Sequence, residues 1–260
     1  MQNMNSIQSI RELNKEATRL PIFGDISKAS ITKESTPFDA IKDKETLSFE
    51  EIIEAISHWF FLQFGEAEII QAYEKFQKWA GRIYYDDYFY HQHVSYFSER
   101  FCFESLTNLN IIPFENFIES QIFNETCSPK AQEYFLSLKQ RVHSLFQVVR
   151  NNKSELITRD LFTSTKYTLP MEAPSYGFEK GSVIQGFLFP CEERLMLSKG
   201  IIIHPPQVEK EIRLQIKRIT KEQEHPLALL SRLARQHIIY RKQKMRDVLK
   251  IYQLDPYPIV

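Results

Sequence analysis

The spacing of apolar residues changes twice along this chain of 260 residues, and this change limits the possible folds more than any other feature. Before Asn151 the apolar residues recur every three or four positions, which is the period of a helix. From there to Pro206 they form short runs, rich in β-branched and aromatic residues, that are separated by turn residues, as in strands. Beyond Pro206 the helical period returns. The pattern predicts an α+β fold with a small antiparallel β-barrel-like module between helical segments.

The strongest helix signal begins at Ser48, because Glu51 follows three residues later in a capping-box pattern. Apolar residues at helical spacing continue from there to Phe64, and Gly65 suits the position directly after a helix. Three further helices are predicted over residues 66–80, 82–103 and 111–123. Residues 1–45 are polar, and we expect a loosely ordered N-terminal arm there.

A Ser-Pro pair marks the next predicted helix, with Ser128 as the N-cap and Pro129 as its first residue. A stripe at helical spacing follows, formed by Ala131, Phe135, Leu138, Val142, Leu145 and Val149. We therefore predict one helix that continues to Asn151. This assignment gives a helical region over residues 46–150.

The predicted β-barrel-like module covers residues 151–206. Its five strands are expected over residues 155–161, 166–169, 182–189, 194–197 and 201–204. Residues 207–260 are predicted to form two helices, the second running from His225 to about Leu254. This C-terminal region carries 12 Lys and Arg against 6 Asp and Glu, although the whole chain has a formal net charge of zero. Because the rest of the chain is equally acidic, we expect these basic helices to pack on the body.

Three motif-bearing segments suggest a family, namely residues 144–149 (S-L-F-Q-V-V), 158–163 (T-R-D-L-F-T) and 181–190 (G-S-V-I-Q-G-F-L-F-P). The chain resembles a poorly characterised bacterial family that shares S-L-F-x-V, R-D-L-x-T and G-D-x-x-x-G-R-L-x-P. Some relatives carry a Cys/His zinc motif like that of the preprotein-translocase ATPase, which this chain lacks. Ser182 and Phe187 replace the family's usual Asp and Arg, so a ligand role of those positions does not carry over. The resemblance implies a small β-barrel module and no particular activity.

The composition bears on compartment and cofactors. Three widely spaced cysteines, Cys102, Cys127 and Cys191, form no C-x-x-C pair and fit a reducing compartment. The first 20 residues lack the apolar core of a signal peptide, and no apolar run approaches the ~18 residues that cross a bilayer. We therefore expect a cytoplasmic protein without a transmembrane segment. With only 7 glycines and no Gly-rich phosphate loop, no cofactor is predicted.

One cluster could bind a metal, because Asp87 and His91 would share a face if residues 82–103 formed a single helix. A solvated polar edge on a helix with a buried aromatic face explains the same residues. The surrounding aromatic run, which includes Tyr84, Tyr85 and Tyr88, could likewise stack nucleic-acid bases or form core. No Lys or Arg interleaves the run before Arg100, and this favours core.

A second candidate site is the cluster of cations in the last predicted helix. Its members that we assign to nucleic-acid or acidic-partner binding are Arg235, Arg241, Lys242, Lys244 and Arg246. Such a cluster can bind phosphates or an acidic protein, or it can form a solvated face that complements the acidic body. No catalytic motif occurs in the sequence. A non-enzymatic interaction or regulatory protein is therefore our first hypothesis, with a nucleic-acid-binding protein and a metal-dependent enzyme around Asp87 and His91 as alternatives.

Overall fold

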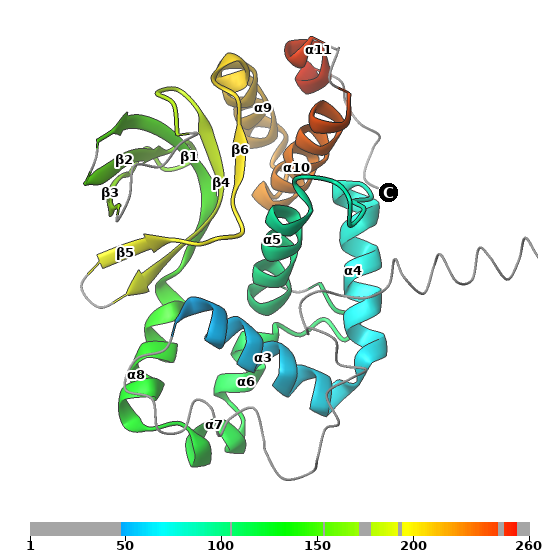
Figure 1. Cartoon of the computed structure of the whole chain (residues 1–260), viewed down its shortest axis with the longest axis vertical. Coiled ribbons are helices and arrows are strands. Elements are labelled where there is room, and N and C mark those ends of the chain that lie inside the picture. Colours follow the sequence, from blue (N-terminus) through cyan, green and yellow to red (C-terminus); the bar gives the residue numbers. More distant parts are fainter. Residues whose placement is uncertain are drawn as a thin grey trace, which may run out of the picture.

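The computed structural model of the chain describes residues 48–104, 106–152, 154–171, 178–191, 194–243 and 247–253. A curled antiparallel sheet forms a half-barrel on one side of the molecule, and helices from both ends of the chain pack beside it (Figure 1). This arrangement confirms the predicted α+β class. The expected N-terminal arm over residues 1–45 lies outside the described residues.

The first helices follow their local signals. The helix α3 (Phe49–Phe64) begins at the predicted capping box, in which Ser48 and Glu51 each hydrogen-bond the other's backbone N–H. Gly65, with φ of +84°, separates α3 from α4 (Glu66–Ala80), and Gly81 at +94° follows α4. These left-handed values suit glycine because it has no Cβ atom.

The next helix starts later than predicted. Residues 82–89 form turns, and α5 covers Tyr90–Phe103 with Phe89 as its N-cap. Downstream, two short helices replace the single one expected over residues 111–123: α6 (Pro113–Ile118) and α7 (Gln121–Thr126). The break occurs at Ser120, whose side chain accepts a hydrogen bond from the Phe123 backbone and thereby caps α7.

The prediction of one helix from Ser128 to Asn151 is wrong. The helix α8 covers Pro129–Ser137, the 3₁₀ turn η2 covers Leu138–Gln140, and Val142–Asn151 is the strand β1. β1 is central in the sheet and has apolar residues on both faces, so it lacks the alternation typical of a half-buried strand. Its apolar residues therefore fitted a helical stripe by coincidence. The sheet consequently begins at Val142 rather than at residue 151.

The remaining strands confirm the predicted five: β2 (Glu155–Asp160), β3 (Lys166–Pro170), β4 (Val183–Cys191), β5 (Arg194–Leu197) and β6 (Ile202–His204). Their order is β3-β2-β1-β4-β5, all neighbours are antiparallel, and β6 also pairs with β4. The register of β1 against β2 shifts between Val148 and Arg150. Such a bulge increases local twist, which suits the curl of this sheet.

The sheet contributes to separate cores on its two faces. Phe146 and Leu188 belong to a cluster formed largely by the strands themselves. Leu145 and Val183 instead pack with apolar residues of the C-terminal helices. Further along β4, Phe187 joins the large core of α3, α4 and α5. The sheet therefore joins the N-terminal and C-terminal helices into one packed unit.

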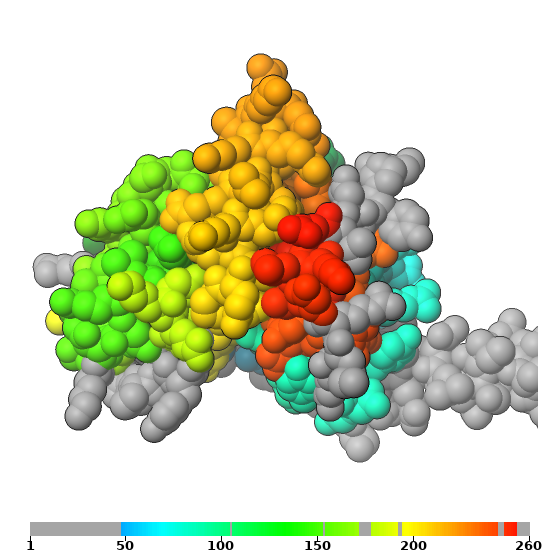
Figure 2. Space-filling view, turned by 90° about the horizontal axis from the view of Figure 1, so that it is seen from above, coloured from blue at the N-terminus to red at the C-terminus, as the bar shows by residue number. Residues whose placement is uncertain are grey.

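After the 3₁₀ turn η3 (Pro206–Val208), the chain continues with α9 (Glu209–Glu222), α10 (Pro226–Lys242) and α11 (Val248–Gln253). The last predicted helix thus ends at Lys242, and a second one begins at Val248. α10 packs against α4, while α11 lies beside α9 in the space-filling view (Figure 2). Among the described residues, none of the helices combines the length and apolar character that crossing a lipid bilayer requires.

Candidate functional site

The basic end of α10 docks on the turn that precedes α5. The Lys242 ammonium lies 2.9 Å from a carboxylate oxygen of Asp87 and donates a hydrogen bond of 3.0 Å to the carbonyl oxygen of Arg82. It also lies 4.4 Å from the centre of the Tyr84 ring. Two residues from separate sequence hypotheses, Asp87 and Lys242, are therefore partners in one ion pair.

Asp87 also shapes the turn itself. Its carboxylate accepts a hydrogen bond of 2.8 Å from the Tyr84 backbone N–H, and its own N–H donates to the Tyr84 carbonyl at 2.9 Å. The Asp87 carbonyl then accepts from the Tyr90 N–H as α5 begins. Short polar side chains of this kind commonly stabilise turns through their own neighbouring backbone. The loop's shape thus depends on the same carboxylate that pairs with Lys242.

Three tyrosine rings project from this turn into solvent. The exposed fractions are 53% for Tyr84, 79% for Tyr85 and 64% for Tyr88. The guanidinium of Arg241 lies 4.2 Å from the centre of the Tyr88 ring, within the range of a cation–π contact. We call the set of Tyr84, Tyr85, Tyr88, Arg241 and Lys242 the tyrosine–cation surface.

The rest of the aromatic run is core, as its helical spacing indicated. Phe89, Tyr90, Phe97, Phe101 and Phe103 are buried. The core interpretation therefore holds for the later part of the run. Its first residues lie in an exposed turn, and the later ones form the buried face of α5.

The two proposed metal ligands lie in different elements of secondary structure. Asp87 lies in the turn, whereas His91 is the second residue of α5 and is exposed beside the rings of Tyr85 and Tyr90. They therefore do not share a helix face as predicted. Within the part of the chain that the structure describes, there is no group of three or more His, Cys, Asp and Glu side chains that could hold a metal ion.

The other basic candidates have different positions. The side chain of Arg235 is half-buried, and its Cγ lies near Gly81 at the end of α4. Lys244 and Arg246 lie outside the described residues. Of the five cations singled out from the sequence, Arg241 and Lys242 contribute directly to the tyrosine–cation surface.

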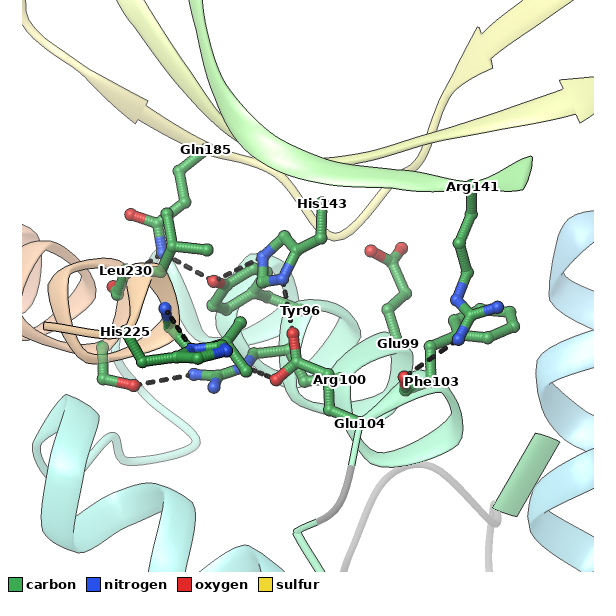
Figure 3. Close-up of polar contacts among 12 residues, drawn as sticks. Tyr96, Glu99, Arg100, Phe103, Glu104, Arg141, His143, Gln185, His225 and Leu230 are labelled. Atoms are coloured by element: carbon green, nitrogen blue, oxygen red, sulfur yellow. Dashed lines mark hydrogen bonds and ion pairs between the residues drawn. The ribbon is translucent and has the colours of Figure 1, made fainter. Parts of the chain in front are cut away.

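A buried polar network links α5 to the sheet and to α10 (Figure 3). His143 of β1 contacts the hydroxyl of Tyr96 at 3.0 Å through one ring nitrogen and a carboxylate oxygen of Glu104 at 2.5 Å through the other. Glu104 also accepts a hydrogen bond of 2.7 Å from Arg100. Burial raises the pKa of Glu104, but the charges of Arg100 and His143 outweigh it and bring the pKa to about 2.

This network has the hydroxyl–imidazole–carboxylate order of a catalytic triad. The Tyr96 side chain, however, is fully buried, and burial raises the pKa of its hydroxyl. The hydroxyl also accepts a hydrogen bond of 2.6 Å from Gln185, which donates as well to the Leu230 carbonyl of α10. These contacts connect α5, β1, β4 and α10, so the arrangement is suited to fixing the fold.

Two more buried polar clusters lie nearby. Glu99 accepts hydrogen bonds from Ser198 at 2.8 Å and from the Gly200 backbone at 2.7 Å, and burial raises its pKa to about 8. On the other side, ring nitrogens of His93 and His237 lie 3.1 Å apart. Sequence spacing could not reveal these contacts, because they join residues that are far apart along the chain.

The tyrosine–cation surface likewise joins residues that are far apart along the chain, so sequence spacing does not predict it. The sequence shows the run of tyrosines, but not the cations that contact their rings. Arg241 and Lys242 supply them from α10, a helix near the other end of the sequence. No family model, curated protein or solved structure matches this chain. The resemblance carried by residues 144–190 accordingly stays a prediction.

Proposed function

We propose that this chain is a non-enzymatic binding protein whose partner docks on the tyrosine–cation surface. The observation that carries this proposal is the exposure of three tyrosine rings, each more than half accessible, within one short turn. Tyr and Arg are enriched where proteins bind, because they offer large contact areas and hydrogen-bonding groups together. The neighbouring guanidinium of Arg241 adds hydrogen-bond donors to the contact area of the rings.

The surface is also held in shape before any partner arrives. Tyr84 and Tyr88 are each covered on one side by a cation, at 4.4 Å and 4.2 Å respectively. The ion pair of Lys242 with Asp87 joins the turn to α10. Binding to such an ordered surface loses less conformational entropy, which favours affinity.

The same contacts show that part of the positive charge of α10 is used within the protein, where it holds α10 on the turn. Lys242 neutralises Asp87, in line with the expectation that the basic C-terminal region packs on the acidic body. This explains the position of α10 but leaves the outer parts of the tyrosine rings accessible. One side of the Tyr84 and Tyr88 rings therefore contacts a cation of α10, while the exposed parts of the rings remain available to a partner.

The alternative of an enzyme has weaker support. In the triad-like network, the Tyr96 side chain is buried and does not reach solvent. The carboxylate of Asp87 forms an ion pair with Lys242 and accepts a hydrogen bond from the Tyr84 backbone. We further infer a cytoplasmic location, which the free thiols of Cys102, Cys127 and Cys191 support, because unpaired cysteines fit a reducing compartment.

The proposal can be tested in cells with a photoreactive amino acid at Tyr85. A matched control carries it at Leu214 of α9, which is 57% exposed and distant in sequence from the surface. We expect a discrete adduct from position 85 that is lost when Arg241 and Lys242 are both changed to Glu. Equal adducts from both positions, or none from position 85, would refute the proposal.

A further inference from the structure

We infer that the partner of the tyrosine–cation surface is a single-stranded nucleic acid. This inference rests on the proposed function and names the class of molecule that the surface binds. Proteins that hold single strands combine aromatic rings, on which bases stack, with cations that follow the phosphates. Both components are present here on adjacent segments.

The rings provide the stacking component. Tyr85 is 79% exposed, and its ring contacts Tyr90 and His91 with rings steeply inclined to its own. Because most of the Tyr85 side chain is exposed despite these contacts, its ring keeps area on which a base can stack. Bases in a duplex are already stacked on their neighbours, so their faces cannot reach such a ring. The geometry consequently favours a single strand over a duplex.

The cations provide the electrostatic component. Arg82 belongs to the turn, the Cγ atom of Arg235 lies near Gly81, and Arg241 and Lys242 contact the tyrosine rings. These four cations outnumber the two carboxylates of the turn, Asp86 and Asp87. The excess of positive charge complements phosphates. An acidic peptide would also meet these charges, but it brings no flat aromatic groups for three tyrosines. The nucleic acid explains both the rings and the charges.

The pairing of Lys242 with Asp87 does not prevent this role. Asp87 also accepts a hydrogen bond from the Tyr84 backbone at 2.8 Å. When the ammonium of Lys242 turns toward a phosphate, the carboxylate therefore keeps a donor. Both side chains of the ion pair are partly exposed, so solvent already screens their attraction and a phosphate can compete.

Binding is measured by fluorescence anisotropy with the full chain and fluorescein-labelled oligothymidine or oligouridine of about 20 nucleotides. A labelled duplex of equal length is the comparison. We expect both single strands to bind more tightly than the duplex, and the two arms show whether DNA or RNA is preferred. Equal or tighter binding of the duplex would overturn the inference.

Substitutions at Tyr85 separate stacking from general apolar contact. Tyr85→Phe keeps the aromatic face and should bind like the parent protein. Tyr85→Leu keeps apolar volume without that face, and we expect about 5- to 150-fold weaker binding, the range found for loss of one base–aromatic stack. Because this side chain is so exposed, both variants should keep the parent's melting temperature. Parent-like affinity of Tyr85→Leu would contradict stacking.

The salt dependence tests the cations. Each phosphate contact on a single strand contributes about 0.7 to the slope of log affinity against log salt concentration. We expect Lys242→Gln to reduce the slope by about this amount. The control Lys217→Gln, at an exposed position of α9, should leave the slope unchanged. Equal effects of the two substitutions would exclude a specific phosphate contact at Lys242.

The two proposals can fail separately. If the oligonucleotides do not bind, but position 85 still forms an adduct that nuclease does not shorten and that contains peptides of a second protein, the partner is a protein. The inference of a nucleic acid then falls and the proposed function stands. Absence of both oligonucleotide binding and the adduct removes both proposals.

Discussion

Acid should destabilise this protein through a cluster of buried histidines below the tyrosine–cation surface. His93 of α5 and His237 of α10 stack with ring centres 5.3 Å apart, and the ring of His204 of β6 meets His237 edge-on. Burial is the main cause that lowers their pKa values, to about 3 for His93 and His204 and well below the usual 6.5 for His237. Arg241 and Lys242 lower the pKa of His93 further, while Asp87 opposes them.

The contacts of these rings suit their neutral forms. His204 is held between the Tyr252 hydroxyl at 2.6 Å and the Gln185 side-chain oxygen at 3.0 Å. The Nδ1 atom of His93 is buried and makes no hydrogen bond with any described residue. A proton added there would have no acceptor, and each added charge would repel the neighbouring histidines. Protonation is therefore coupled to opening of the fold.

The direction of the pH effect follows from where the protons bind. Below pH 6.5 the unfolded chain takes up a proton on each histidine. In the folded chain, His93 and His204 remain neutral until about pH 3, and the pKa of His237 also lies well below 6.5. The stability that depends on neutral histidines is thus complete above pH 6.5 and is lost as the pH falls through this window. Between pH 7.5 and 5 the loss is about 2 kcal/mol for each histidine, or about 6 kcal/mol for three.

Glu99 acts in the opposite direction. Its pKa is raised to about 8, so the folded chain holds a proton that the unfolded chain releases above pH 4.5. Lowering the pH from 7.5 to 5 therefore raises the free energy of unfolding by about 3 kcal/mol through Glu99. The net loss is about 3 kcal/mol, a large part of the roughly 5–15 kcal/mol that typical domains possess. The lowered pKa of His143 acts in the same direction as the histidine cluster.

Urea unfolding at pH 7.5, 6 and 5, followed by circular dichroism, measures this effect. His93→Gln keeps a polar atom near the His237 ring but cannot titrate, so its stability should depend less on pH by about 1.4 kcal/mol per pH unit. As a control, His225→Ser removes an exposed histidine and keeps an N-cap side chain. Unchanged stability between pH 7.5 and 5, or equal slopes for His93→Gln and the parent, would refute the role of the cluster.

Three further predictions concern the polar contacts of α5. Between pH 5 and 8, Glu99→Gln should gain stability relative to the parent by about 1.4 kcal/mol for each pH unit. The reason is that the stability contributed by the protonated carboxyl is lost as the pH rises toward its folded pKa of about 8, and parallel urea titrations of the two proteins check this. Gly200→Ala should lower stability by at least about 1–3 kcal/mol, because the new Cβ would lie 2.6 Å from the Tyr96 backbone nitrogen, and an unchanged urea midpoint would contradict this close packing. Arg100→Met should cost about 3–5 kcal/mol by leaving Glu104 buried without its cation. Adding Glu104→Gln should recover part of that loss in a double-mutant cycle, and if it recovers nothing, the pairing is not the cause.

Local signals in the sequence determined much of the fold. The capping pair Ser48 and Glu51, the glycine after each of the first two helices, and five of the strands were all predicted from neighbouring residues. Such signals act over a few residues, because capping, turn formation and side-chain periodicity depend on nearby backbone. The error at β1 has the converse cause. A strand covered on both faces loses its alternation, so only its pairing with β2 and β4 identifies it.

The candidate surface depended on the tertiary structure. Tyr84, Tyr85 and Tyr88 lie in one short segment, whereas the cations that contact the rings of Tyr84 and Tyr88, Lys242 and Arg241, lie near the other end of the sequence. Packing of α10 against α4 brings the two groups together. The buried histidine cluster likewise joins α5, β6 and α10. Periodicity reports which face of an element is buried, but it does not report which distant element covers that face, because that choice is made by packing between whole elements.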